Sequence, residues 1–234
     1  MPRVKPLLRG LARRQLLVGG GLVCWCLGMR PSHAGSFDDY FAAVKRDNMS
    51  ALLALLLRGF DVNTVDEKGQ HGLHVALRSD SLEVALFLAK LTGVQVNAAT
   101  PQGETPLMIA ALRGHTEVAR ALIAQGADVN KPGWTPLHYA ATHAGPAAKE
   151  LVALLLEQHA YIDAESPNGT TPLMMAAQYG EPDVLRLLLE EGADPMLRNQ
   201  QKLSALDFAV LGSRPTSAEI IQAHVKKAQP KGKW

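Results

Sequence analysis

Apolar residues recur along this chain at helical spacing, in pairs of short segments. In the longer segment of two such pairs, the apolar positions follow i, i+3 and i+4. They are Val118, Ala121 and Leu122 in one pair and Val184, Leu187 and Leu188 in another. The shorter segment before each carries small residues, among them Ala110 and Ala111 or Ala176 and Ala177. This pattern predicts pairs of short helices, in which the alanine helix packs closely against its neighbours and the leucine-rich helix presents one apolar face to a core.

The helix pairs repeat at a fixed period. It can be measured at the residue that closes each leucine-rich segment: Gly59, Gly93, Gly126, His159 and Gly192. The steps between them are 34, 33, 33 and 33 residues. A period of this size indicates a stack of similar units, none of which can bury its apolar face alone.

Local signals place the ends of the helices. Thr105, Thr135 and Thr171 each precede a proline, which predicts a capping residue followed by proline at the first helical position. Glycine after the leucine-rich segment suits a left-handed residue that ends the helix. His159 replaces that glycine once, and we expect the replacement to cost some stability.

The chain resembles the ankyrin repeat family. The segment TPLHYAA, from Thr135 to Ala141, and the 33-residue period carry the resemblance, which covers roughly Phe37 to Lys227. It implies an all-α solenoid of stacked helix-turn-helix units with β-hairpin fingers, about six units including the two caps. The expected repeat domain is 35–228, with units near 37–67, 68–101, 102–131, 132–167, 168–200 and 201–228.

The two end units depart from the repeat as caps should. The first, Phe37 to Asn63, has the helix pair but no TPL entry, and the last has LSALDFAVLG in place of TPLHxAA. Lys226 and Lys227 end the last helix, where positive charge opposes the helix dipole. A basic tail, 229–234, follows and is expected to be solvated.

Residues 1–34 have the layout of a cleavable secretory signal. Five basic residues without an acid precede the apolar stretch LLVGGGLVCWCLG, and SHA ends at Ala34 with small residues at −3 and −1. Arg13 and Arg14 resemble a twin-arginine export pair, but Ser or Thr before the pair and Phe after it are missing, so the Sec route stays open. The alternative is an uncleaved inner-membrane anchor formed by residues 16–27, although a comfortable span needs about 20 apolar residues. We therefore expect a bacterial protein that is periplasmic or secreted, without a stable membrane span once the signal is removed.

Export would also change charge and cysteine content. The full chain has a formal net charge of +2, whereas residues 35–234 hold 18 basic and 22 acidic residues, a net charge of −4. Nucleic acid is an unfavourable partner for such a surface. Both cysteines, Cys24 and Cys26, lie in the signal, so the mature chain would have no thiol.

The sequence offers no catalytic site. His74 and His138 occupy the TPLH histidine position and His115 another repeat position, where the resemblance implies a structural role between repeats. The pairs His71 and His74, or His138 and His143, have spacings that a metal could use, but no further ligand completes a site. We expect no enzyme activity, no metal and no cofactor.

The resemblance implies that the fingers and inner helices form a concave face that binds a protein. Finger positions there are Gln70, Glu104, Trp134 and Thr170, and inner-helix positions are Arg78, Leu112, Arg113, Thr142, His143, Gln178 and Tyr179. Trp134 is the strongest candidate because exposed tryptophan is enriched at binding hot spots. Its finger is also three residues short, with nine residues from Gly126 to Thr135 against twelve in three other units, and the following helix-helix turn is three residues longer. We expect the partner to contact this region.

The function expected from these features is a non-catalytic interaction module for an exported or envelope protein. Two alternatives are an inhibitor or immunity-type protein and an accessory or chaperone of a specific exported enzyme. A hydrolase or metal enzyme is a remote further alternative.

Overall fold

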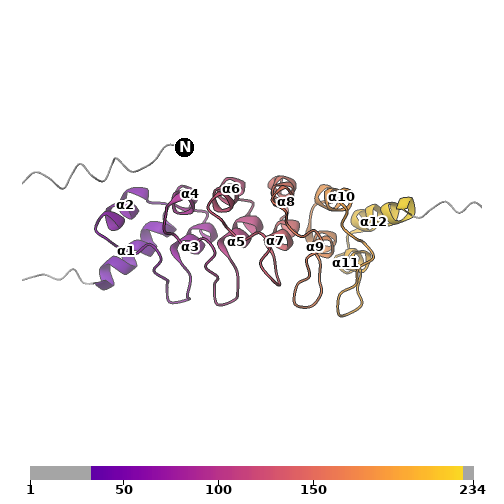
Figure 1. Ribbon diagram of the computed structural model, residues 1–234, viewed down its shortest axis with the longest axis horizontal. Helices are drawn as coiled ribbons and strands as arrows, with labels where there is room; N and C mark the ends of the chain where they lie inside the picture. The colour runs from indigo at the N-terminus through magenta and orange to yellow at the C-terminus, as the bar shows by residue number, and fades with distance from the viewer. Residues whose placement is uncertain (1–32, 229–234) are drawn as a thin grey trace, which may run out of the picture. The chain divides into compact units, whose positions relative to one another are not determined.

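The computed structural model describes residues 33–228, and these form one row of stacked helix pairs (Figure 1). Within that range there are twelve α-helices and no regular strand. The inner row consists of α1 (His33–Lys45), α3 (Gly72–Arg78), α5 (Pro106–Arg113), α7 (Pro136–Thr142), α9 (Pro172–Tyr179) and α11 (Ala205–Leu211). The outer row consists of α2 (Met49–Leu57), α4 (Leu82–Lys90), α6 (Thr116–Ala124), α8 (Ala147–Glu157), α10 (Pro182–Glu190) and α12 (Pro215–Ala228). The all-α solenoid that the resemblance implied is confirmed.

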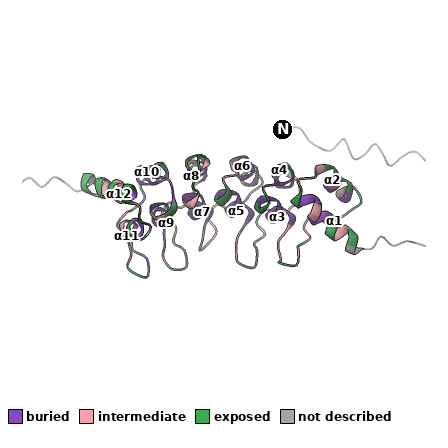
Figure 2. Ribbon diagram, turned by 180° about the vertical axis from the view of Figure 1, so that it is seen from behind, coloured by how far each residue is buried: buried purple, intermediate pink, exposed green. Residues whose placement is uncertain are grey.

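The core lies between the two rows and between successive pairs (Figure 2). The inner-helix alanines are fully buried, as their size predicts, because neighbouring helices approach over them: Ala76, Ala110, Ala111, Ala140, Ala141, Ala176 and Ala177. On the outer helices, Val118, Ala121, Leu122, Val184 and Leu188 are buried. Leu187 was expected in this set but is only partly buried, because the apolar face of α10 is centred on Val184, Leu185, Leu188 and Leu189.

The predicted helix caps form. The hydroxyl of Thr105, Thr135 or Thr171 accepts a hydrogen bond from the backbone N–H three residues later, and a proline occupies the first helical position in each case. The residue that closes the leucine-rich segment is left-handed in all five places, with φ of 63° at His159 and 85–101° at the glycines. The interpretation of His159 as a replacement for glycine in a strained position is therefore consistent with the backbone.

A ladder of asparagines joins successive units. Asn63 Oδ1 accepts from the backbone N–H of Gln95 at 2.9 Å, while Asn63 Nδ2 donates to the carbonyl of Gly93 at 2.8 Å. Asn97 and Asn130 repeat both bonds one and two units further on.

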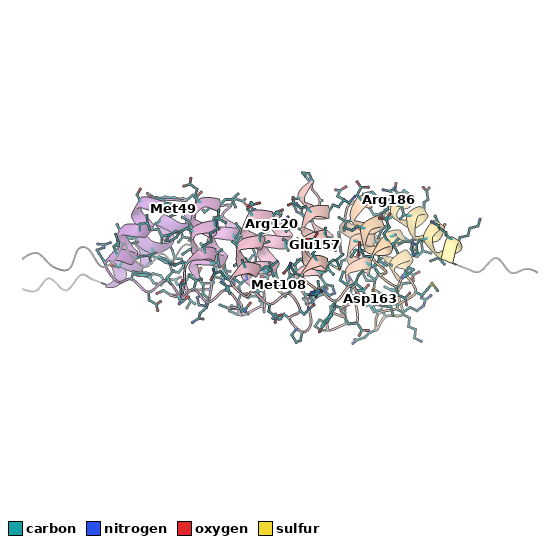
Figure 3. The ribbon with its side chains drawn as sticks, turned by 45° about the horizontal axis from the view of Figure 1, so that its top comes forward. Met49, Met108, Arg120, Glu157, Asp163 and Arg186 are labelled. Atoms are coloured by element: carbon teal, nitrogen blue, oxygen red, sulfur yellow. The ribbon has the colours of Figure 1, made fainter. Side chains whose placement is uncertain are left out.

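The fourth position of this ladder is an aspartate. Asp163 accepts from the N–H of Asp194 at 3.2 Å, but a carboxylate has no N–H to donate to a carbonyl. Burial, followed by the nearby charge of Asp194, raises the pKa of Asp163. Asp163 lies on the finger side of the stack, away from Arg186 on the outer helices (Figure 3).

Residues 1–32 of the predicted signal, which include the alternative anchor at residues 16–27, and the basic tail at 229–234 lie outside the described residues. No helix within residues 33–228 is both long and apolar enough to cross a membrane.

Candidate protein-binding face

Four fingers are closed by one shared device. In each finger, the backbone N–H of the first residue at the tip donates a hydrogen bond to the carbonyl four residues later. The side chain of the same residue accepts hydrogen bonds from backbone N–H groups of the turn. These first residues are Asp66, Thr100, Ser166 and Asn199. The predicted β-hairpins are thus tight hydrogen-bonded turns, with a single isolated β-bridge, Val65 to His71, within the described chain.

The finger before α7 is built differently. Residues 127–134 hold no such side-chain closure among the described hydrogen bonds, and the loop reaches less far than its neighbours (Figure 1). The chain turns instead at Gly133, where φ is 85°. This places Trp134 directly at the base of the finger, and its ring meets the ring of His138 edge-on with centroids 5.2 Å apart.

An apolar pocket opens beside Trp134. Its volume is about 270 Å³, and it is lined by Leu112, Trp134, His138, Tyr139, Thr142 and Met175. These residues come from α5, α7, α9 and the short finger, so three successive units build the pocket. The pocket lies in the region where we predict the partner contact.

His138 forms the floor of this pocket and is fixed on both sides of its ring. Nδ1 accepts from the backbone N–H of Thr135 at 3.2 Å, and Nε2 donates to the carbonyl of Thr170 in the next finger at 2.9 Å. Burial lowers the pKa of His138, since the charged form would be desolvated. His138 therefore joins two units as a neutral ring.

His74 has the same role in the second unit. Its Nε2 donates to the carbonyl of Ala98 at 3.0 Å, and burial, assisted by the neighbouring His71, lowers its pKa to about 4. Met108 and Met174 occupy the equivalent positions in the third and fifth units, where the sulfur faces the N–H of the capping threonine. The structural role that the resemblance implied for these histidines has a direct physical basis.

Two ion pairs flank the pocket on its N-terminal side. Arg78 pairs with Glu104, and Arg113 pairs with Asp80. Glu104 also accepts a hydrogen bond from Tyr139, and the pKa of Tyr139 is raised by burial and then by the charge of Glu104. Arg78, Glu104 and Tyr139 consequently link the second, third and fourth units across this face.

The other predicted contact residues differ in accessibility. Tyr179 is exposed, whereas Gln70 and His143 are half-buried. The ring of His143 faces the turn after α5, where its Nδ1 lies 3.0 Å from the carbonyl of Leu112. Thr170 is 2% exposed, so its side chain is withdrawn from a partner and its carbonyl serves His138 instead. We leave Thr170 out of the contact surface for this reason.

Tyr139 and Met175 were missed by the sequence reasoning. They occupy the position between the TPLH residue and the alanine pair, where Val75 and Ile109 are buried in the second and third units. The signal was therefore a large residue at a position that is normally core. In the fourth and fifth units this residue, Tyr139 or Met175, is only partly buried and lines the pocket.

The histidines of this face do not assemble a metal site in the described part of the chain. The rings of His71 and His74 are 5.8 Å apart between centroids, and no group of three His, Cys, Asp or Glu side chains within residues 33–228 is arranged to hold a metal ion. What the geometry provides is an apolar recess with a polar, charge-paired border.

The chain belongs to the ankyrin repeat family. The model for ankyrin repeats (3 copies) matches residues 40–132, 88–166 and 143–229. Members of this fold are generally binding scaffolds for proteins rather than enzymes.

Curated relatives share the repeats only. The chain is 28% identical over 174 residues to the human transient receptor potential cation channel subfamily A member 1, covering 68% of this chain and 16% of the channel. It is 33% identical over 155 residues to the mouse nuclear factor NF-kappa-B p105 subunit, covering 64% of this chain and 16% of that protein. The chain thus spans about a sixth of the length of these relatives.

Two solved structures are similar over most of their own length. One is in the complex of the predatory endopeptidase Bd0816 from Bdellovibrio bacteriovorus with immunity protein Bd3460, at a TM-score of 0.68, 26% identity and coverage of 79% of this chain and 97% of that chain. The other is the human ASB11 ankyrin repeat domain, at a TM-score of 0.70, 27% identity and coverage of 82% and 85%.

Proposed function

We propose that the chain is a non-catalytic binding module that holds an exported or envelope protein on its concave face. The observation that carries the proposal is the apolar pocket beside Trp134, open on the face formed by the fingers and inner helices. A tryptophan that forms one wall of a recess is the kind of residue that dominates binding energy when a partner covers it.

An immunity-type role is a specific second candidate. The similarity to the immunity protein complex covers almost the whole of that chain and most of this one. By analogy, the concave face would bind an exported enzyme and block it. An accessory protein or chaperone would use the same face and leave its enzyme active.

Export itself belongs to this proposal, and it rests on the signal-like layout of residues 1–34. Cell fractionation followed by N-terminal sequencing should place the protein in the periplasm or medium, with Gly35 first. Substituting Arg13 and Arg14 with lysine separates the two routes, because a twin-arginine route requires the pair and the Sec route does not. A full-length N-terminus in the membrane fraction would favour the anchor instead.

The binding proposal is tested by affinity capture with residues 33–234, which contain every described helix. The bait is exposed to an envelope extract of its own organism, and captured proteins are identified by mass spectrometry. Trp134→Ala is compared with Glu117→Ala, an exposed change on α6. We expect a specific enzyme to be captured by the wild type and the α6 variant and to be at least tenfold depleted with Trp134→Ala.

The activity of the captured enzyme then separates the candidates. Inhibition at saturating bait supports an immunity-type protein, and unchanged or increased activity supports an accessory role. Capture that is equal for Trp134→Ala and wild type would contradict the proposed face.

A further inference from the structure

The pocket beside Trp134 has the size of a site for one side chain. Its volume of about 270 Å³ lies below the range of roughly 300–1,000 Å³ that is typical of small-molecule sites, and it is open to the concave face. A metabolite or cofactor would leave much of its surface outside.

The pocket also favours a neutral occupant. Every side chain that lines it is uncharged, given that His138 is held neutral by burial. The charged groups at its border are already paired, Glu104 with Arg78 and Arg113 with Asp80. A charged group inserted here would lose its hydration without gaining a free counter-ion, which is unfavourable.

An exposed apolar strip continues from the pocket towards the C-terminal units. Tyr179 at the end of α9 is 49% exposed, and Val210 and Leu211 at the end of α11 are 67% and 61% exposed. Together with Leu112, which is 39% exposed, Tyr179 and Leu211 lie near the C-terminal ends of the inner helices α5, α9 and α11. Six exposed acidic residues lie away from the pocket on the outer helices, Glu83, Glu117, Glu150, Glu157, Asp183 and Glu190, whereas the exposed Asp80 at the pocket border is paired with Arg113. Exposed apolar residues gathered on one face mark a surface for a protein.

We infer that the occupant is a loop of a protein partner that inserts one large neutral apolar side chain, of leucine, methionine or phenylalanine type, beside Trp134. One flank of this loop lies over Tyr179 and Leu211, and the other flank faces the paired charges of Arg78 and Arg113. The shortened finger is the reason that the loop can enter, because a finger of ordinary length would extend beside the recess. This inference rests on the proposed concave binding face and assigns the chemistry of its partner.

The test uses disulfide-closed loop peptides, selected from a displayed library on residues 33–234. Their affinities are measured against the wild type, Thr142→Phe and Trp134→Ala. Thr142→Phe fills the pocket from its wall at the end of α7, and Trp134→Ala removes another wall. Gln158→Phe is the matched control, since it adds the same ring to an exposed position after α8 in the same unit. Circular dichroism and thermal melting confirm that each variant is folded.

We expect the selected loops to share one apolar residue whose replacement by alanine weakens binding at least tenfold. Thr142→Phe and Trp134→Ala should each weaken binding at least tenfold, whereas Gln158→Phe should change it less than twofold. The loop in which the apolar residue is replaced by alanine should bind Thr142→Phe almost as tightly as it binds the wild type, because both changes remove the same contact.

Three outcomes overturn the inference. They are loops anchored by a charged residue in the pocket, loops that bind Thr142→Phe as tightly as the wild type, and a selection that enriches no loop. Affinity that is lost on Tyr179→Ser but kept on Thr142→Phe would reject the pocket while leaving the concave face in place. Loops that are displaced only by changes on the outer helices, such as Glu117→Phe, would instead count against the proposed function itself.

Discussion

The third and fourth units, near 102–131 and 132–167, share one framework and differ at nearly every position where the framework allows a choice. The third has a finger of ordinary length, a methionine at position 108, a glycine at 126 and an asparagine at 130. The fourth has the short finger with Trp134, and then His138, His159 and Asp163 at the corresponding positions. The short finger and Trp134 border a recess, whereas we expect His159 and Asp163 only to weaken the scaffold. The comparison teaches that departures from a repeat have to be sorted by what they build before they are interpreted as function.

The largest expected effect is a loss of stability on acidification in the units that have histidine, rather than methionine, at the TPLH position. Because the folded-state pKa of His74 is lowered from 6.5 to about 4, its contribution to stability is complete above pH 6.5 and is lost as the pH falls towards 4. A displacement of this size corresponds to about 3 kcal/mol. His138 acts in the same direction.

Denaturant unfolding of residues 33–234 at pH 7 and pH 4 measures this loss. The variant His74→Met/His138→Met copies the residues of the third and fifth units and should lose less stability on acidification. It should also be less stable at pH 7, by about 1 kcal/mol for each lost hydrogen bond to the next unit. An equal loss on acidification in both proteins would show that other groups control the acid response.

The next effect is the change in stability when the left-handed residue that closes the leucine-rich segment is substituted in each of the two units. His159→Gly should stabilise the chain by about 1 kcal/mol, since glycine has no Cβ penalty at the φ of 63° found there. Gly126→Ala, at a φ of 85° with open space around a new Cβ, should destabilise by a similar amount. Thermal unfolding of both variants checks this. Shifts of the same sign would show that the backbone conformation is not the cause.

An effect of similar size concerns the asparagine ladder. Asp163→Asn restores an amide that can donate to the carbonyl of Gly192, as Asn130 donates to that of His159, and should add about 1 kcal/mol. The raised pKa of Asp163 means that its protonated form is favoured in the fold, so this residue's contribution decreases as the pH rises from 3.8 through its folded-state pKa.

The gain from Asp163→Asn should therefore be larger at pH 7 than at pH 3.5. Asn130→Asp is the reverse change in the preceding unit and should be destabilising. A gain from Asp163→Asn that does not depend on pH would contradict the ionic component of this account.

The smallest effect on stability is expected at Glu104, which joins the two units. Glu104→Gln should change the free energy of unfolding by less than about 1 kcal/mol, because the pair with Arg78 is partly exposed. It should lower the pKa of Tyr139, which the charge of Glu104 helps to raise. Ultraviolet titration of the variant, with Tyr139→Phe used to assign the signal, gives the result. An unchanged Tyr139 titration would leave burial as the sole cause of the raised pKa.

Most of the scaffold could be predicted because it follows local rules that repeat. The capping threonines, the glycines after the leucine-rich segments and the alanines of the inner helices each appear several times, so the structure confirms one pattern in many places. Trp134 and the short finger were also visible in the sequence, because the spacing from Gly126 to Thr135 is nine residues instead of twelve.

The pocket was harder to predict because it depends on side chains that are left partly uncovered. Tyr139 and Met175 occupy a position that is buried as Val75 and Ile109 in the second and third units, and no local signal shows that it is partly open in the fourth and fifth. The burial of Thr170 was also not predicted. Its carbonyl accepts a hydrogen bond from His138 in the previous unit, and this contact joins residues that are 32 positions apart in the sequence.

The ladder that ends at Asp163 also has a consequence for cooperativity. Each asparagine bonds only to the next unit, so the stack unfolds as a row of coupled segments rather than as one indivisible body. The amide bond is missing between the fourth and fifth units, where the bond from His138 to the carbonyl of Thr170 remains. We expect the loss to let the last two units open as a group while the first four stay folded, which hydrogen exchange would detect as faster exchange in α9 to α12 than in α3 to α6.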